Sequence, residues 1–293
     1  MSNKERCGYV AIIGRPNVGK STLLNHLIGQ KISITSHKPQ TTRHRLLGIK
    51  TENECQIIYV DTPGIHLHQA NAMNRYLNRA ATSSIEGVDL VVWLVESLHW
   101  TKEDEFVLKT LSQYSVPVIL CVNKIDQIND KNRLLPYLQD IASKYKFTDI
   151  FPISASKGLN LPELEQKIID LLPTNIHVFP EDQLTDRNER FLAAEIIREK
   201  LLKRLNAEIP YRLTVQIETF TEKHIGAIIW IERQTQKSII IGAKGNVLKA
   251  VGEMARKDIE IMLERKIFLE LWVKVKQGWC DDERALQQLG YVE

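Results

Sequence analysis

Short hydrophobic runs alternate with longer segments of helical spacing through the first 172 residues of the chain. The runs lie at about 8–13, 56–60, 89–95, 117–122 and 150–153. Their continuous apolar character is typical of strands that are buried on both faces. Because strands that alternate with helices are joined by right-handed crossovers, the pattern predicts an α/β domain with a doubly wound, mostly parallel sheet.

The pattern stops at Pro173, and the next thirteen residues contain a second proline and no clear periodicity. We interpret residues 174–186 as a linker between a first domain at 1–173 and a second at 187–293. Asp186 and Glu189 have the spacing of a capping box, which predicts a long amphipathic helix with Asp186 as its N-cap.

The second domain is predicted to be smaller and of the α+β class. The elements expected after its first helix are strands at 212–218, 227–233 and 237–241, a helix that ends near Lys266, and a strand at 267–276. Trp230, Phe268 and Trp272 fall in these strands, so we expect them to pack in the core. Trp279 follows the last strand and is the freer candidate for contact with a ligand.

A glycine-rich loop follows the first hydrophobic run and leads into a helical segment. In a strand–loop–helix turn of this kind several backbone N–H groups point toward one site, and that site favours a phosphate. Lys20 can reach the β- and γ-phosphates, and the Ser21 hydroxyl can ligate Mg²⁺. The alternative is a plain turn before an amphipathic helix. The loop residues are Gly14, Arg15, Pro16, Asn17, Val18, Gly19, Lys20, Ser21 and Thr22.

Three more polar segments end predicted strands. Asp61 can hold magnesium through water, and Gly64 allows a backbone N–H to approach the γ-phosphate. Asp126 can accept two hydrogen bonds from guanine that adenine does not offer, so we predict a guanine nucleotide. Each segment alone is an ordinary turn, but parallel sheets bind ligands at this edge. The segments comprise Asp61, Thr62, Pro63, Gly64, Ile65; Asn123, Lys124, Ile125, Asp126; and Ser154, Ala155, Ser156, whose backbone can meet the guanine O6.

These segments resemble the G1, G3, G4 and G5 motifs of the P-loop GTPases. The resemblance implies GTP and GDP as substrate and product and Mg²⁺ as cofactor. It also implies a magnesium-binding threonine in the polar stretch 38–45, which maps onto Thr42, with Thr41 as the alternative. The metal ligands are then Ser21, Thr42 and Asp61, and the candidate catalytic residues are Lys20, Thr42, Gly64 and Asn17.

Hydrolysis departs from the Ras-like pattern at Ile65, where those enzymes carry the glutamine that orients water. We therefore expect slow intrinsic turnover. In similar GTPases an asparagine at the Asn17 position coordinates K⁺, so K⁺ is a further candidate ion here. His66 and His68 are predicted to belong to a mobile switch surface rather than to a metal site.

The order of elements around Gly242 and Gly245 resembles the type II KH domain, whose Gly-x-x-Gly loop clamps single-stranded RNA. From residue 175 onward the chain has nineteen basic and nineteen acidic residues, so any attraction for RNA is local. A plain turn, with the domain acting as a protein-docking or membrane-docking module, is the alternative. A further alternative, an RNA-modifying enzyme, lacks candidate catalytic groups in this domain. The predicted RNA-binding residues are Gly242, Ala243, Lys244, Gly245 and Lys249.

The combination of both domains resembles the Era family of bacterial GTPases. That resemblance implies binding to the 3′ end of 16S ribosomal RNA, a role in 30S subunit assembly, and loose association with the inner membrane. The chain of 293 residues has four widely spaced cysteines without metal spacing or a disulfide pattern. No hydrophobic run is long enough to cross a bilayer, so we expect a soluble, cytoplasmic protein. We also expect a monomer, although the sequence does not fix the oligomeric state.

Overall fold

The computed structural model describes residues 5–65, 72–205 and 209–291, and the chain divides into two compact units. The first unit comprises Met1–Ser33, Thr42–Gln69 and Leu77–Asp186. The second comprises Ile34–Thr41, Ala70–Tyr76 and Arg187–Glu293. Two short segments from the amino-terminal half of the chain therefore group with its carboxyl-terminal part.

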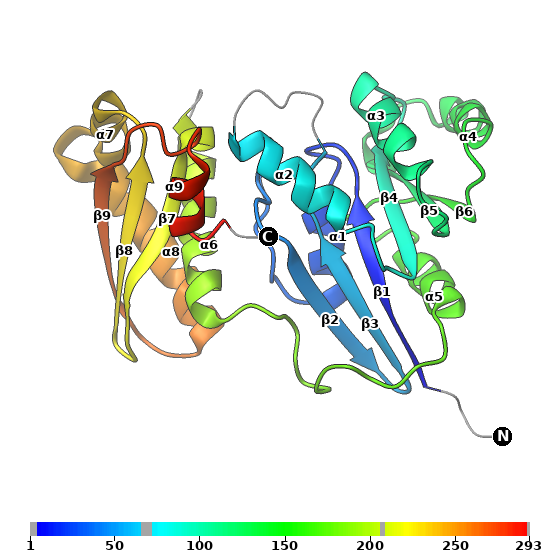
Figure 1. Cartoon of the computed structure of the whole chain (residues 1–293), viewed down its shortest axis with the longest axis horizontal. Helices are drawn as coiled ribbons and strands as arrows, with labels where there is room; N and C mark the ends of the chain where they lie inside the picture. Colours follow the sequence, from blue (N-terminus) through cyan, green and yellow to red (C-terminus); the bar gives the residue numbers. More distant parts are fainter. Residues whose placement is uncertain (1–4, 66–71, 206–208, 292–293) are drawn as a thin grey trace. The chain divides into compact units, whose positions relative to one another are not determined.

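The first unit is built on a six-stranded sheet in the order β2-β3-β1-β4-β5-β6 (Figure 1). β2 pairs antiparallel with β3, and the other pairs are parallel. The strands are β1 (Arg6–Ile13), β2 (Leu46–Glu52), β3 (Cys55–Asp61), β4 (Leu90–Glu96), β5 (Val118–Asn123) and β6 (Asp149–Pro152). The doubly wound, mostly parallel sheet is confirmed. The sequence pattern missed β2, because an edge strand that is only partly buried lacks a continuous hydrophobic run.

Helices cover both faces of this sheet. They are α1 (Lys20–Ile28), α2 (Ala72–Ser83), α3 (Lys102–Leu111), α4 (Leu134–Ala142) and α5 (Leu161–Leu171), with short 3₁₀ turns η1 (Ile125–Gln127) and η2 (Lys131–Arg133). α2, α3 and α4 contribute Ala81, Val107 and Ile141 to a core around the fully buried Trp93. α1 contacts β1, β2 and β3 and lies behind the sheet in the view of Figure 1, whereas α2 lies in front.

Residues 174–186 are bound along the β2–β3 edge of the first unit. The Gln56 side chain accepts hydrogen bonds from the backbone N–H groups of Val178 (2.8 Å) and Phe179 (2.9 Å). The Asp186 carboxylate accepts from the Leu47 N–H at 2.9 Å, so the expectation that it caps the following helix is wrong. Asn188 is the N-cap instead, and its side chain accepts from the Phe191 N–H at 2.9 Å.

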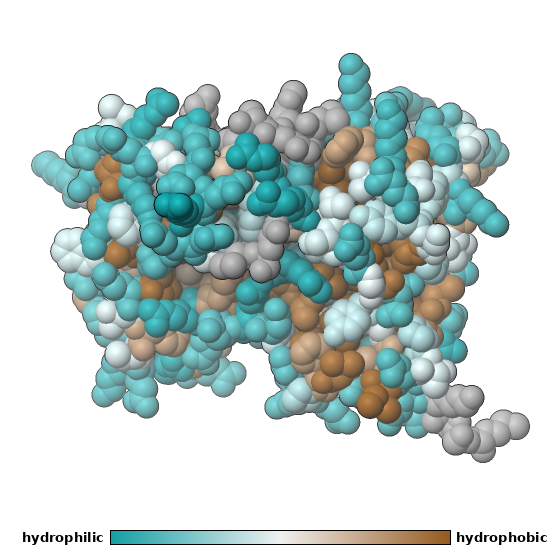
Figure 2. Space-filling model, in the orientation of Figure 1, coloured by the Kyte–Doolittle hydropathy of each residue, from teal (hydrophilic) through white to brown (hydrophobic). Residues whose placement is uncertain are grey.

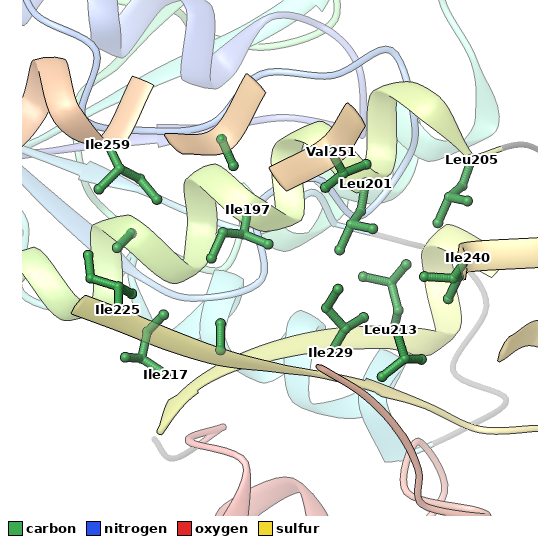
Figure 3. Packing of buried hydrophobic residues seen from close by; sticks show 14 of the residues in the cluster. Ile197, Leu201, Leu205, Leu213, Ile217, Ile225, Ile229, Ile240, Val251 and Ile259 are labelled. Atoms are coloured by element: carbon green, nitrogen blue, oxygen red, sulfur yellow. The ribbon is translucent and has the colours of Figure 1, made fainter. Parts of the chain in front are cut away.

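The second unit packs helices on one face of a three-stranded sheet in the order β7-β8-β9. Its elements are α6 (Glu189–Arg204), η3 (Ile209–Arg212), β7 (Leu213–Phe220), β8 (His224–Ile231), α7 (Gln234–Ile241), η4 (Ala243–Gly245), α8 (Asn246–Leu263), β9 (Phe268–Val275) and α9 (Glu283–Gln288). β8 pairs antiparallel with β7 and parallel with β9. Figure 3 shows Ile197 and Leu201 of α6 pointing toward Ile229 of β8 and Leu213 of β7 in the core between the layers.

The structure overturns the prediction of a strand at 237–241, because these residues form most of α7. The Gln236 side chain accepts hydrogen bonds from the backbone N–H groups of Glu232 (3.1 Å) and Arg233 (3.0 Å), which closes the start of the helix. Ile240 is fully buried in the core. The run of isoleucines favoured a strand locally, and tertiary packing together with this cap overrode that preference.

The aromatic residues of the second unit are also placed differently from the prediction. Phe268 and Trp272 are 65% and 55% exposed, because they lie on the face of β9 that no helix covers. Trp279, predicted to be free, is fully buried and stacks on Tyr291 with ring centroids 6.1 Å apart. The expectation that Phe268 and Trp272 pack in the core was wrong because position in a strand does not show which face of a small sheet is covered by helices.

Hydrophilic side chains cover most of the face of the molecule that Figure 2 shows. Among the residues that the structure describes, no helix has both the length and the hydrophobicity needed to span a bilayer. The four cysteines are free thiols, and burial raises the pKa of Cys7, Cys55 and Cys121.

Candidate functional site

The glycine-rich loop lies at the carboxyl end of β1, between β3 and β4, and leads into α1. Gly19 has a φ of +105°, and a Cβ there would lie 2.3 Å from the side-chain nitrogen of Asn123. A larger residue would therefore be strained and would also collide with the end of β5. Asn17 also has a left-handed backbone, with a φ of 63°. The loop has the conformation expected for a phosphate-binding loop.

Lys20, the first residue of α1, is buried beneath this loop. Its ammonium group donates to the carbonyl oxygens of Gly14 (3.0 Å) and Arg15 (2.9 Å). Burial lowers the pKa of Lys20 to about 8. A phosphate placed in the loop would favour the charged form, because it would return negative charge to a site that has lost its water.

Two hydroxyl groups donate to the buried carboxylate of Asp61 at the end of β3, and a third lies next to one of them. Ser21 Oγ lies 3.0 Å and Ser33 Oγ lies 2.8 Å from Asp61 Oδ2. Ser21 Oγ also lies 2.8 Å from Thr42 Oγ1, whereas the Thr41 hydroxyl donates to the Lys38 carbonyl at 2.6 Å. The other oxygen, Asp61 Oδ1, is buried and accepts no hydrogen bond from the described residues. Burial raises the pKa of Asp61.

This cluster of oxygens fits a hard divalent cation. Mg²⁺ binds carboxylate, hydroxyl and water oxygens, and a cation would satisfy the unpaired Asp61 Oδ1. It would also offset the desolvation that raises the pKa of Asp61. Ser33 is the member of the cluster that the sequence analysis missed, because a lone serine in a polar loop carries no local signal.

The buried side chain of Asn123, the last residue of β5, contacts both the phosphate-binding loop and the segment after β6. Its Nδ2 donates to the Val18 carbonyl at 2.7 Å, and its Oδ1 accepts from the Ala155 N–H at 2.9 Å. Asn123 therefore ties the phosphate-binding loop to the segment at 154–158. Asp126 is exposed, and its carboxylate accepts from Ser154 Oγ at 2.5 Å. It is accessible to a base.

A network of charged groups supports the other side of the loop. Arg15 donates to Glu96 at 2.8 Å and to Asp104 at 3.2 Å, and Lys124 lies 3.1 Å from Glu96. Ion pairing lowers the pKa of Glu96 against the opposing effect of its burial, whereas burial raises the pKa of Asp104. Asp104 was missed as a site residue, although Thr101 and Asp104 form a capping box that a sequence can reveal.

Ile65 and Gly64 close the phosphate side of the site. Gly64 lies against Pro16, since an added Cβ would be 2.8 Å from the Pro16 ring. The Ile65 side chain is 1% exposed and belongs to the core of the first unit. It therefore packs among hydrophobic side chains, and it has no polar group with which to orient a water molecule. His66 and His68 lie outside the described residues.

The second unit presents the Gly-x-x-Gly loop as η4, between α7 and α8. Ala243, Lys244 and Lys249 are exposed. The loop lies directly before the first turn of α8, an 18-residue helix, so its backbone N–H groups and the helix dipole favour an anion there.

Comparison with known proteins agrees with both units. Residues 9–124 match the family described as 50S ribosome-binding GTPase, and residues 208–280 match the KH domain. The chain is 55% identical over 292 residues to the GTPase Era of Ectopseudomonas mendocina, with 98% of each protein covered. It is 54% identical over 290 residues to the GTPase Era of Pseudomonas aeruginosa, with 98% of this chain and 95% of that protein covered. The chain belongs to the Era family.

Two solved Era structures share the fold. One holds MgGDPNP and nucleotides 1506–1542 of 16S ribosomal RNA; it has a TM-score of 0.96 and 40% identity, and covers 99% of this chain and 100% of that one. The other is an Aquifex aeolicus Era variant bound to GDP·AlF4⁻, with a TM-score of 0.95, 40% identity, and coverage of 98% and 100%. Membership of the Era family confirms the predicted GTPase domain, KH domain and GTP hydrolysis. The roles of single residues stay predictions.

Proposed function

We propose that this Era-family protein is a GTP-hydrolysing switch that binds the 3′ end of 16S ribosomal RNA through its KH domain and acts in 30S subunit assembly. The observation that carries the proposal is the oxygen cluster of Ser21, Thr42 and the buried Asp61 beside the phosphate-binding loop. It occurs in a chain that also contains a KH domain. The solved Era complex with MgGDPNP and 16S RNA supports the same reading.

In this proposal Ser21 and Thr42 hold Mg²⁺ directly and Asp61 holds it through water. Thr42 is preferred to Thr41 because its hydroxyl faces Ser21, whereas the Thr41 hydroxyl is used within its own loop. Mg²⁺ would neutralise charge on the β- and γ-phosphates. Lys20 binds the same phosphates, and Asp126 selects guanine. Calorimetry with GTP and ATP tests the base: equal affinity for both nucleotides would refute the role of Asp126.

Hydrolysis is proposed to depend on K⁺ held by Asn17, because Ile65 is buried in the core and cannot orient water. K⁺ next to the β/γ bridge would stabilise charge that an arginine finger stabilises elsewhere. GTP turnover should be faster in KCl than in NaCl, and Asn17→Ala should lose that difference while still binding GTP. Equal turnover in the two salts refutes the K⁺ proposal and leaves the GTPase assignment intact.

RNA binding is proposed at the Gly-x-x-Gly loop, where Lys244 and Lys249 supply charge and Gly245 leaves room for a phosphodiester. A Cβ at Gly242 would lie 2.4 Å from Asn246 Oδ1 and Val247 Cγ2, so a substitution there would distort the loop itself. A Cβ at Gly245 meets nothing within 4 Å, although its φ of +79° disfavours most residues. Gly245 is therefore the better position for a test.

Gly245→Asp and Gly245→Asn form a matched pair, because they have the same shape and differ in charge, and both residues tolerate a left-handed backbone. The aspartate should weaken binding of a 16S 3′-end oligonucleotide roughly tenfold more than the asparagine, because it repels the phosphodiester. Lys223→Ala, at the far turn between β7 and β8, is the control for general charge. Equal binding by both Gly245 variants would contradict the proposed contact.

The two activities are proposed to be coupled, with GTP and Mg²⁺ ordering the Thr42 and 61–68 segments and so repositioning the KH domain. By linkage, RNA must tighten GTP by the factor by which GTP tightens RNA. RNA affinity that is identical in the GDP, GTP and empty states would refute the coupling. The proposal places the protein in the cytoplasm as a monomer, and loose inner-membrane association stays a prediction from the resemblance.

A further inference from the structure

α6 of the second unit has two buried faces of different character. Ala193, Ile197 and Leu201 point into the hydrophobic core of the unit. A second face carries Arg198 and Glu199, which are 1% and 0% exposed. Burying a charged side chain costs free energy unless the charge is paired, and charged side chains do not add to the packing of the hydrophobic core. Their partners therefore show what this second face holds.

The partners include the backbone of Ile34–Thr41, the segment that groups with the second unit and ends directly before Thr42. Glu199 Oε1 accepts from the Thr35 N–H at 3.1 Å and lies 3.5 Å from its hydroxyl. Arg198 Nη2 donates to the Thr41 carbonyl oxygen. Two consecutive residues of one helix thus hold both ends of an eight-residue segment.

Both charges also have ion-pair partners on α6 itself. Arg198 pairs with Glu195 at 2.6 Å. Glu199 pairs with Lys200 at 3.1 Å and with Lys203 at 3.2 Å. Networks of this kind fix side-chain rotamers, so the acceptor and the donor offered to the segment are preorganised.

The second short segment of this unit is fixed in the same way. The Met73 N–H donates to the Cys280 carbonyl at 3.1 Å, and the rings of Tyr76 and Tyr291 meet edge to face at 5.7 Å. The two segments are joined to each other, because the Gln40 side chain donates to Asn74 Oδ1 at 2.8 Å. The second unit thus holds the chain on the amino-terminal side of Thr42 and at the start of α2.

We propose that Arg198 and Glu199 are positioning residues for magnesium and GTP, which act by fixing the segment that delivers Thr42. The peptide bond from Thr41 to Thr42 transmits this constraint, because the Thr41 carbonyl is held by Arg198 while the Thr42 hydroxyl lies 2.8 Å from Ser21 Oγ. The inference rests on the proposed role of Thr42 as a magnesium ligand. The KH domain then stabilises the GTP state through its first helix, whether or not RNA is bound.

The test compares nucleotide affinities rather than activity. Glu199→Ala should weaken binding of a non-hydrolysable GTP analogue about 10- to 150-fold, the span expected for losing one charge-assisted hydrogen bond, and should change GDP affinity less than about twofold. GDP is spared because ordering of this segment by magnesium depends on the γ-phosphate. The Mg²⁺ concentration needed for half-maximal binding of the analogue should rise, whereas that for GDP should not.

Matched variants separate positioning from folding. Glu199→Gln keeps an acceptor for the Thr35 N–H and should recover most of the affinity, and Arg198→Lys keeps a donor for the Thr41 carbonyl and should lose less than Arg198→Ala. Glu218→Ala, at an exposed position of β7, is the control for loss of a carboxylate. If Glu199→Ala does not fold, as judged by circular dichroism and 16S RNA binding, the comparison of Arg198→Ala with Arg198→Lys carries the test.

An equal loss of GTP-analogue and GDP affinity, or no loss of either, overturns the positioning role. A wild-type protein that binds no GTP at all refutes the proposed function itself, so the two failures are distinguishable.

Discussion

Asn123→Ala is the substitution whose consequence the structure determines most directly. Its side-chain amide makes two buried hydrogen bonds, to the Val18 carbonyl and from the Ala155 N–H. Asn123 is 3% exposed, and Val18 and Ala155 are 0% and 2% exposed. Water therefore cannot replace the lost partner without entering the core, and both backbone groups are left unsatisfied.

Each buried polar group that loses its partner costs about 1–3 kcal/mol, so the expected loss of stability is roughly 2–6 kcal/mol. For a domain of this size about 1 kcal/mol lowers the melting temperature by roughly 2–4 °C. The first unit of Asn123→Ala should therefore melt roughly 5–20 °C lower than that of the wild type. The effect should appear without nucleotide, because both hydrogen bonds lie within the protein.

Asp126→Asn is the matched comparison from the same motif. Asp126 is exposed and its carboxylate accepts from Ser154 Oγ, so the change should leave the nucleotide-free melting temperature within about 2 °C of the wild type. It should instead abolish the preference for GTP over ATP in calorimetry. Differential scanning calorimetry of the three proteins provides the measurement. If both variants melt alike, or if Asn123→Ala loses only base preference, the structural role assigned to Asn123 is wrong.

Three further predictions follow from buried groups. GTP affinity should fall by up to about tenfold as the pH rises from 8 to 9, because the pKa of Lys20 is about 8 in the free protein and the phosphates raise it, so that binding takes up a proton. Calorimetry in buffers of different ionisation enthalpy would detect this proton uptake, and its absence would contradict the argument. Arg15→Met should lose more stability at pH 7.5 than at pH 5, because burial already raises the pKa of Asp104, loss of the guanidinium raises it further, and protonation at low pH removes the unpaired buried charge. Urea denaturation at the two pH values measures whether the loss of stability is larger at pH 7.5. Trp279→Ala, at a fully buried position, should lower the free energy of unfolding by about 3–5 kcal/mol, whereas Trp272→Ala, at an exposed position, should lower it by less than about 1 kcal/mol. Similar melting temperatures for the two variants would refute this prediction.

The motifs of the first unit could be recognised from the sequence because their chemistry is local. A phosphate-binding loop needs Gly19, Lys20 and Ser21 at fixed spacing, and a strand that ends at Asp61 places a carboxylate at the sheet edge whatever surrounds it. Continuous hydrophobic runs located five of the six strands for the same reason. The edge strand β2 was not predicted, because its partly exposed residues form neither a continuous hydrophobic run nor a clear alternation of hydrophobic and polar residues.

Contacts between distant residues could not be predicted. Nothing near Ser33 shows that its hydroxyl reaches Asp61, twenty-eight residues further along the chain. The capping-box spacing of Asp186 and Glu189 pointed to the wrong cap, because the Asp186 carboxylate is used by the Leu47 N–H instead. Such hydrogen bonds depend on how two distant segments are positioned in the folded chain, and a local sequence pattern does not contain that information.

The sequence alone thus determined the family, the two domains and the kind of ligand, because those depend on residue types at short, fixed separations. Tertiary structure decided that the hydroxyl of Thr42 rather than that of Thr41 faces Ser21, that Phe268 and Trp272 are exposed, and that α6 holds the segment before Thr42. The physical reason is that burial and hydrogen-bond partners are properties of the packed chain. A side chain acquires them only when residues far apart in the sequence are brought together.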